Sequence, residues 1–285
     1  GKSDSLCNIS DKPIGELIFQ YEETDWEFLN RFLSKYNDSL YPAATYETIH
    51  FQAGLAIQSE DVKWDNRPYQ KKKDFSRFAY LTKNGFADLV PVQFTYYCLE
   101  NYDVIALGSQ ILYKGNLLYI SRITRELKNG LLVNTYELKQ KKAMVVERFY
   151  NSRLTGISQY ATVVNTQRDR VQVLMNNDLI AESCYWYPFS SVSASSDGSG
   201  WYCMPEKGES VRVYFPTENE RDAYVITCVK GHAPEGAQDP MGNPAVRSIS
   251  TDAGNLVQFN DEGILIEAKT GNASISLKNN GEILV

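Results

Sequence analysis

The C-terminal stretch 260–285, NDEGILIEAKTGNASISLKNNGEILV, alternates apolar and polar residues in the manner of short β-strands. Asp-Glu-Gly, Lys-Thr-Gly and Asn-Asn-Gly interrupt the alternation, and each ends in a glycine, which accepts the positive φ of a tight turn at little cost. The apolar side consists of Ile264, Ile266, Ile275, Leu277, Ile283 and Val285. Two or three such strands alone are marginally stable in water and leave open edges, so we expect something else to cover this side.

The size and charge of the chain restrict its class. Its 285 residues give room for one large domain or two to three smaller ones. The formal net charge is −6 and the densest basic cluster, Lys71–Lys73, is short, which argues against nucleic-acid binding because that rests on a broad basic face. We interpret Lys71–Lys73 as a solvated loop. No apolar run approaches the ~20 residues of a membrane-spanning helix.

The cysteines indicate neither a disulfide framework nor a zinc site, because they are odd in number, irregularly spaced and without a C-x-x-C pair. This pattern favours synthesis in a reducing compartment. Tyr185, Tyr202 and Val229 stand next to three of them and predict strand interiors, where a free cysteine behaves as a small buried hydrophobic residue. The five are Cys7, Cys98, Cys184, Cys203 and Cys228.

One helix is clearly marked, at 25–36. Thr24 and Glu27 have the spacing of a T-x-x-E capping box, and an apolar stripe then recurs at steps of three and four residues. The stripe consists of Trp26, Leu29, Phe32, Leu33 and Tyr36. We expect it to pack in the core, with Arg31 and Lys35 on or near the other side of the helix.

Residues 46–150 read mostly as an antiparallel meander, which predicts a barrel or a strongly twisted sheet with the helix packed alongside. Asn84-Gly85 and Asn129-Gly130 are hairpin signals within alternating runs, and Lys-Gly-Asn at 114–116 is a further turn.

Five short strands are predicted in the following part of the chain, separated by turns rich in Gly, Ser and Pro. Their ranges are 159–165, 170–175, 182–187, 208–215 and 223–230. Five short strands suit a small closed barrel of the OB type. A linker at 234–244, rich in Pro and Gly, then leads to the terminal strands.

Groups suited to catalysis are scarce. The only two histidines are His50, in a predicted strand, and His232, in a turn, and we expect both to be structural or solvated. No metalloprotease, serine-hydrolase, P-loop or dinucleotide-binding motif occurs. The acidic pairs Glu22-Glu23 and Glu60-Asp61 are weak candidates for a glycosidase dyad, because adjacency in sequence says nothing of separation across a substrate. We therefore expect no enzymatic activity, no cofactor and no metal.

The barrel segment suggests a binding role as an alternative. OB barrels hold single-stranded nucleic acid on aromatic platforms within basic grooves, and Trp186, Tyr187, Phe189 and Trp201 supply aromatic rings. Acidic residues roughly balance the basic ones in this segment. We therefore favour a structural role in which these rings cover barrel ends or an interface between domains.

Three stretches share their motifs and their order with a known family. The first is QYEETDWEFLNRFLSKYN at 20–37, the second GWYCMPEKGESVRVYF at 200–215, and the third begins NPAVRSISTDAGNLVQF at 243–259. The second fills a W-x-x-x-P-x-x-G-x-x-V-x-V-x-F signature with Trp201, Pro205, Gly208, Val211, Val213 and Phe215. Together they resemble the baseplate hub of contractile phage tails (the late control gene D group) and type VI secretion spikes (the valine–glycine repeat protein G family).

The resemblance covers about residues 14–285 and implies a mainly β fold in four parts. These are a hub-like β-barrel domain with the helix at 1–150, an OB-fold domain at 156–233, the linker at 234–244, and the base of an intertwined β-helical spike at 245–285. Family hubs carry another barrel before the helix motif, for which there is little room here. We therefore expect a chain cut from a longer protein or a reduced version.

The resemblance also implies a homotrimer in which two further copies cover the apolar terminal strands. Such a protein would join a tail tube to a membrane-piercing needle, with tube and baseplate proteins as partners and a tip protein or effector at the spike end. It would be made in the bacterial cytoplasm, assembled in the baseplate and ejected, touching the target envelope transiently. No nucleic-acid partner and no cofactor are implied.

Two alternative functions stay open. The OB barrel could be a carbohydrate or nucleic-acid binding module, which an oligonucleotide affinity lost in Trp201→Ala would favour. The chain could also be a tail-associated cell-wall hydrolase, which clearing of a cell-wall substrate would favour.

Overall fold

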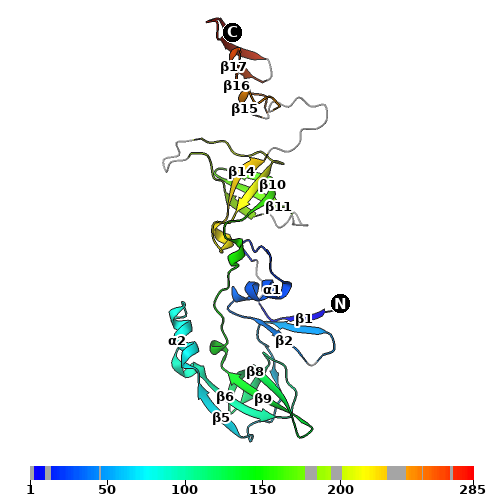
Figure 1. Ribbon diagram of the computed structural model, residues 1–285. Coiled ribbons are helices and arrows are strands. Elements are labelled where there is room, and N and C mark those ends of the chain that lie inside the picture. The colour runs from blue at the N-terminus through cyan, green and yellow to red at the C-terminus, as the bar shows by residue number, and fades with distance from the viewer. Residues whose placement is uncertain are drawn as a thin grey trace. The chain divides into compact units, whose positions relative to one another are not determined.

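The structure is a computed structural model that describes residues 3–9, 14–44, 46–176, 185–193, 201–229, 242–251, 253–269 and 272–285. The chain divides into two units, Gly1–Cys228 and Val229–Val285 (Figure 1). The fold is mainly β, as predicted, with four sheets and two α-helices in the described residues. In this described part neither a closed barrel nor a β-helix is seen, so the predicted hub barrel and β-helical spike base are not reproduced in the single chain.

Helix α1 (Asp25–Ser34) confirms the predicted helix and its capping box. The hydroxyl of Thr24 accepts from the backbone N–H of Glu27 at 3.3 Å, and the Glu27 carboxylate accepts from the N–H of Thr24 at 2.8 Å. The helix ends two residues earlier than predicted, and Asn37 follows with a left-handed φ of 57°. Of the predicted stripe only Leu33 is fully buried, while Leu29, Phe32 and Tyr36 are half-buried.

The first unit begins with a small sheet in the order β1-β3-β2, in which β1 is parallel to β3. Its strands are β1 (Ser3–Cys7), β2 (Leu40–Pro42) and β3 (Ile49–Ala53). Trp26 does not reach the core as predicted: it is 43% exposed and meets the ring of Phe51 edge-on. His50 lies within β3, so the strand predicted around it is confirmed.

A six-stranded sheet follows in the order β4-β7-β8-β9-β6-β5, open at both edges in the described residues. Its strands are β4 (Ser59–Glu60), β5 (Tyr69–Lys73), β6 (Thr95–Asn101), β7 (Gln110–Tyr113), β8 (Asn116–Lys128) and β9 (Leu131–Lys139). One side buries a core of Trp64, Leu99, Ile111, Tyr113, Leu118, Ile120, Tyr136 and Leu138. Lys71–Lys73 is exposed but belongs to β5, so its interpretation as a loop is wrong.

The two Asn-Gly pairs have different structures. Asn129-Gly130 joins β8 to β9 with both φ values positive, which confirms the predicted hairpin. Asn84-Gly85 instead ends helix α2 (Phe75–Lys83), so that hairpin prediction is wrong. The carboxylate of Asp74 caps α2 by accepting from the N–H of Arg77 at 3.0 Å. An Asn-Gly pair supplies positive φ equally well for a tight hairpin and for the end of a helix, so the pair alone does not separate the two.

All five strands predicted for the OB segment are present as a sheet in the order β12-β11-β10-β13-β14. They are β10 (Ser158–Gln167), β11 (Arg170–Met175), β12 (Tyr185–Pro188), β13 (Ser210–Tyr214) and β14 (Tyr224–Val229). The predicted residues 182–184 and 230 lie outside the described part. A single bridge between Phe189 and Val225 connects the end of β12 to β14.

The second unit is a five-stranded antiparallel meander in which each strand pairs with the next along the chain. Its strands are β15 (Arg247–Ser250), β16 (Leu256–Asn260), β17 (Gly263–Ala268), β18 (Ala273–Lys278) and β19 (Ile283–Leu284). This arrangement confirms the strand pattern predicted for the C-terminal stretch.

The cysteines agree with the prediction only in part, since Cys228 lies within β14 as predicted. Cys7 and Cys203 are exposed, Cys98 is half-buried, and all three are free thiols. Cys203 lies outside any strand, so the predicted strand interior is wrong there. The side chains of Cys184 and Cys228, like the predicted turn at His232, lie outside the described residues. Within the described part of the chain, neither helix has the length and apolar character to span a membrane.

Candidate assembly site

The second unit presents one apolar sheet face. Residues directly opposite each other on neighbouring strands share a face, and the register aligns Ile249, Val257, Ile266 and Ile275 in one row. The adjoining row consists of Phe259, Ile264, Leu277 and Ile283. Both rows point to the same side because their members alternate along each strand.

The six residues predicted for a trimer interface therefore come together. Five belong to the two rows, and Val285 lines an open groove of about 500 Å³ together with Ile266 and Ile275. Ile266 is 43% exposed and Ile283 66%, and none of the buried core residues belongs to the described part of the second unit. A single chain thus leaves this face in contact with water.

The opposite face of the same sheet is more polar. Its central row consists of Ser248, Gln258, Leu265, Ser276 and Leu284, and the next row holds Ser250, Leu256, Glu267 and Ser274. The contrast between the two faces points to association through the apolar one, because an apolar surface of this kind on a small sheet marks an interaction site.

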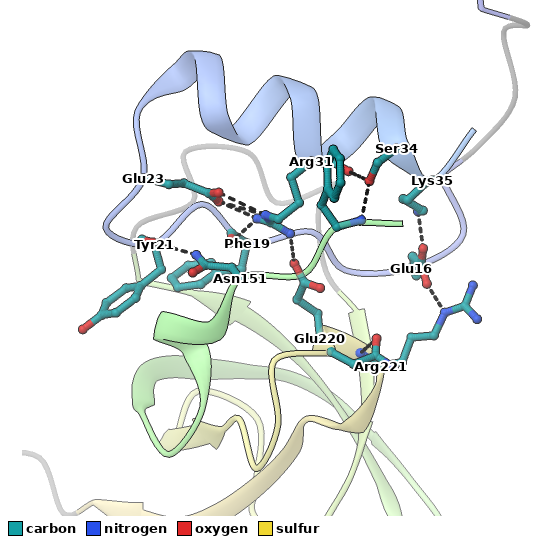
Figure 2. Close-up of polar contacts among 12 residues, drawn as sticks. Glu16, Phe19, Tyr21, Glu23, Arg31, Ser34, Lys35, Asn151, Glu220 and Arg221 are labelled. Atoms are coloured by element: carbon teal, nitrogen blue, oxygen red, sulfur yellow. Dashed lines mark hydrogen bonds and ion pairs between the residues drawn. The ribbon is translucent and has the colours of Figure 1, made fainter. Parts of the chain in front are cut away.

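The first unit contains a cluster of buried charged side chains that is centred on Arg31 of α1 (Figure 2). Its guanidinium lies 2.5 Å from Glu23, pairs with Glu220 in the 3₁₀ turn Glu220–Asp222, and donates to the carbonyl of Phe19 at 3.0 Å. All three charged side chains are almost fully buried. Arg31 was predicted on or near the exposed side of the helix, and that prediction is wrong.

Electrostatics favour the charged state of Arg31. Burial lowers the pKa of the guanidinium, but the hydrogen bonds and charges of Glu23 and Glu220 outweigh it and raise that pKa above its usual value. Each carboxylate in turn has the guanidinium as its counter-ion. The three groups therefore form a satisfied buried ion cluster that connects the helix to the OB segment.

A third carboxylate, Glu16, pairs with three cationic side chains where the helix meets the OB segment. It pairs with Lys35 at the C-cap of α1, with Arg221 from the 3₁₀ turn, and with Arg148 at 3.2 Å. Burial raises the pKa of Glu16, but its bonds to Lys35 and Arg221 and the charge of Arg148 lower it more, so the net pKa is below its usual range. Lys35, also predicted near the exposed side, is largely buried here.

The segment around these charges also packs into the OB core. Phe19 is buried and its ring stacks on Phe215 with centroids 5.7 Å apart. Asn151 donates to the carbonyl of Tyr21 at 2.8 Å, which ties the chain leaving the six-stranded sheet to the chain entering α1 (Figure 2). The core of the OB segment is thus completed by a residue that precedes the helix.

The OB signature residues have mostly structural positions. Val211, Val213 and Phe215 are fully buried, Pro205 is buried, and Gly208 has a φ of 93° that favours glycine. Trp201, by contrast, is 60% exposed.

The aromatic residues of the binding alternative are not placed alike. Tyr187 is buried in the OB core, Trp186 and Phe189 are half-buried, and Trp201 is exposed. They do not form one exposed platform. We therefore find no support in these positions for the aromatic groove that single-stranded nucleic acid requires.

The acidic pairs considered as a glycosidase dyad lie in environments unrelated to each other. Glu23 is held by Arg31, and Glu60 is exposed at the sheet edge in β4. Among the described residues no group of three or more His, Cys, Asp or Glu side chains could hold a metal ion.

Sequence reasoning missed the Arg31 cluster for a physical reason. The motif at 20–37 contains both Glu23 and Arg31, and their presence together in that motif was the available signal for a pair. Nothing in the sequence pointed to Glu220, which lies 189 positions further along the chain.

Comparisons with known proteins agree with this placement of the OB segment. Residues 159–229, about a quarter of the chain, match the family model described as the type VI secretion system/phage-baseplate injector OB domain. No curated protein sequence matches the chain. The OB segment therefore relates the protein to phage-baseplate and type VI secretion components at the level of the family.

Two solved structures are similar over larger parts. The E. coli c3393 protein, a type VI secretion component similar to the T4 bacteriophage tail proteins gp27 and gp5, has 14% identity and a TM-score of 0.47 over 80% of this chain. A chain of the Francisella PdpA–VgrG complex has 8% identity and a TM-score of 0.32 over 99% of this chain. The protein spans 66% and 49% of those two chains. The family match is the comparison that bears on function.

Proposed function

We propose that the protein is a structural hub–spike component of a phage-tail-like contractile injection machine. In this role the first unit belongs to the end of the tail tube, and the second unit forms the base of a needle made by three copies. The work is mechanical, and we propose no catalytic step and no cofactor. The match of residues 159–229 to the injector OB domain is the observation that carries the proposal.

The apolar face of the second unit supports the association of copies. Burying an Ile, Leu or Val side chain contributes about 1.5–3 kcal/mol, so the six predicted interface residues would contribute on the order of 10 kcal/mol per chain before the entropy of ordering is counted. A second gain is that edge strands of one copy would find partners in the next, which removes open edges. Three copies around one axis satisfy both requirements with identical contacts.

The junction in the first unit supports the transmission of force. An OB segment that transmits force must not swing away from the hub, and the buried pairs of Arg31 with Glu23 and Glu220 join the helix to the OB segment within the first unit. Because these charges are shielded from water, salt screens them little.

The test is the mass of the full chain in solution by light scattering after gel filtration. We expect a trimer for the unchanged protein and a monomer for Ile266→Asp/Ile275→Asp, because two carboxylates would lie on the face that copies share. The matched control is Ser248→Asp/Ser276→Asp, which adds two carboxylates to the opposite face, across from Gln258 and Leu265, and should leave the trimer intact.

Two results would count against the proposal. A monomeric unchanged chain would remove the case for threefold assembly through this face. An equal loss of mass in Ser248→Asp/Ser276→Asp would show that added charge, and not its position on the apolar face, disrupts assembly. Circular dichroism of each variant checks that the strands are retained.

A further inference from the structure

An open groove of about 390 Å³ lies in the first unit, lined by the end of β2, by β8 and by the loop that precedes β7. Most of its wall is apolar, and one arginine brings a positive charge to it. The apolar residues are Pro42, Ala44, Ala106, Leu107 and Ile123, and the arginine is Arg125. A mainly apolar wall with a few polar groups, at a volume of about 300–1,000 Å³, is typical of a ligand site.

A bulge in β8 determines which side chains face the core side of the six-stranded sheet. The pairing of β8 with β9 shifts by one residue at Ser121, which is therefore the extra residue of the bulge. Because side chains alternate along a strand, the extra residue moves the following odd-numbered positions to the core side, where Ile123 packs. Arg125 shares this side with Ile123, and the side chain of Arg122 lies on the opposite face.

The loop before β7 is fixed in place beside the groove. The N–H of Gly108 donates to the carbonyl of Ile120 at 2.9 Å, and the carbonyl of Gly108 accepts from the N–H of Ala56 at 3.1 Å. Gly108 has a φ of +80°, and a Cβ there would lie 2.6 Å from the ring of Tyr41. Glycine thus allows the loop to lie close to Tyr41, and the groove is formed in the single chain without a ligand.

Arg125 is a half-buried cation without a partner. Its Nε is shielded from water and has no hydrogen-bond partner. Among the described residues its guanidinium forms no ion pair, and no Asp or Glu lines the groove. Arg122, by contrast, lies 3.7 Å from Glu137. A charge withdrawn from water without a counter-ion lowers stability, so Arg125 calls for an anion from outside the chain.

We propose that this groove binds a carboxylate carried on a short aliphatic body. The Nη groups of Arg125 donate to the carboxylate, because guanidinium and carboxylate match in geometry, and the aliphatic body lies against Leu107 and Ile123. A monoanion fits because one unpaired cation faces an apolar wall, whereas a phosphate carries more charge and a nucleic acid needs a broad basic face. The site goes beyond the proposed function, since it requires neither the apolar face of the second unit nor another copy.

A free aliphatic acid and the C-terminus of an apolar peptide share this chemistry, and the test separates them. Binding to the full chain is measured by ligand-observed NMR titration with hexanoate and with N-acetyl-Ala-Leu. Hexanamide and the amidated peptide are the uncharged counterparts. The tighter of the two carboxylates identifies the source.

Three variants test the role of the guanidinium. Arg125→Met removes the charge at similar length, and Arg125→Lys keeps the charge without the planar pair of donors. Arg122→Met is the matched control, because it removes the same charge from the opposite face of the same strand.

We expect at least one carboxylate to bind with a dissociation constant of about 1 mM, a range suited to ligands of about ten non-hydrogen atoms. The uncharged counterparts should bind about tenfold more weakly or worse, and so should either carboxylate to Arg125→Met. Arg125→Lys should lose less, and Arg122→Met should stay within about twofold of the unchanged protein.

A second measurement does not depend on the ligand chosen. Without ligand, Arg125→Met should raise the midpoint of urea unfolding, because an apolar side chain replaces a half-buried charge that has no counter-ion. Arg122→Met should leave the midpoint nearly unchanged, because its ion pair is exposed.

Three results would overturn the proposal. The first is a lower urea midpoint in Arg125→Met, which would show that the chain itself stabilises the guanidinium. The second is no binding of either carboxylate up to about 20 mM, or binding that Arg125→Met leaves unchanged. The third is a loss of mass in Arg125→Met by light scattering, which would show that another copy fills the groove. The mass of the unchanged chain tests threefold assembly separately, so either proposal can fail alone.

Discussion

Arg31 shows how one side chain can hold two parts of a chain together. It is buried beside two carboxylates that come from segments far apart in sequence, and each carboxylate depends on it for its counter-ion. A buried ion pair contributes little net stability compared with apolar residues, but removing one partner is costly because the other charge is left unpaired in a poorly solvated place. Loss of Arg31 should therefore lower stability mainly because it leaves Glu23 and Glu220 buried without a counter-ion.

Arg31→Met is expected to lower the free energy of unfolding by about 3–5 kcal/mol, because it leaves Glu23 and Glu220 buried without a cation. Urea unfolding followed by tryptophan fluorescence measures it. Arg122→Met is the matched control: its side chain is 71% exposed and 3.7 Å from Glu137, so the change should stay within about 1 kcal/mol. Equal effects of the two substitutions would contradict the view of Arg31 as the centre of the junction.

The lowered pKa of Glu16 predicts that the free energy of unfolding depends on pH. Its pKa in the folded protein is lowered below the usual 4.5, net of the burial that raises it, so the folded state binds its proton less readily than the unfolded state. The stabilisation is therefore complete above pH 4.5 and is lost as the pH falls through the lower folded value. Urea unfolding of the unchanged protein and of Glu16→Gln between pH 3 and pH 7 should show the difference between them shrinking toward acid. A constant difference would contradict this.

At the scale of elements, Gly263 fixes the turn between β16 and β17. Its φ is +148°, and a Cβ there would lie 1.9 Å from the carbonyl oxygen of Leu277 on β18. Gly281 also has a positive φ but has open space around the same position. Both glycines thus have a positive φ that would strain another residue, but a Cβ would clash with a neighbouring strand only at Gly263.

Gly263→Ala should therefore disrupt pairing of β17 with β18, while Gly281→Ala should cost only the backbone strain, about 1 kcal/mol. Hydrogen exchange of the amides in 263–278 measures the effect, and we expect loss of protection in Gly263→Ala alone. Comparable protection in both variants would mean that the strands shift apart to accept the methyl group.

Elements were predictable from the sequence where the pattern itself contains the cause. The capping box at Thr24, the Asn129-Gly130 hairpin, the five OB strands and the terminal meander all follow from local periodicity and turn chemistry. Helix α2 was missed because Asn84-Gly85 fits both a hairpin and a helix end. Trp26 and Arg31 were placed on the wrong sides because the apolar stripe does not show which neighbours a helix will meet.

At the scale of the molecule, the two units differ in what stabilises them. The first has several buried apolar cores, and none of the buried core residues belongs to the described part of the second. We therefore expect the stability of the second unit to depend on contacts with other copies, as the proposed function requires. Its apolar face could be predicted from the alternation, whereas further copies as its cover were implied by the family resemblance alone and stay a prediction.

The melting of the whole chain should accordingly occur in two transitions. The transition of the second unit should move to higher temperature as protein concentration rises, because association stabilises only the folded strands, and that of the first unit should respond much less. Calorimetry over a hundredfold range of concentration measures both. A second-unit transition that does not move with concentration would contradict a shared apolar face.

The tie between Asn151 and Tyr21 has a consequence for how the six-stranded sheet is attached. The polypeptide enters that region past Tyr21 and leaves it past Asn151, and both passages lie against the OB segment through Phe19 and Leu154. The region that contains the six-stranded sheet is therefore connected to the OB segment by two stretches of polypeptide and not by a single hinge. If the protein transmits force as proposed, we expect a load to divide between these two connections, so that a cut in either one leaves the other intact.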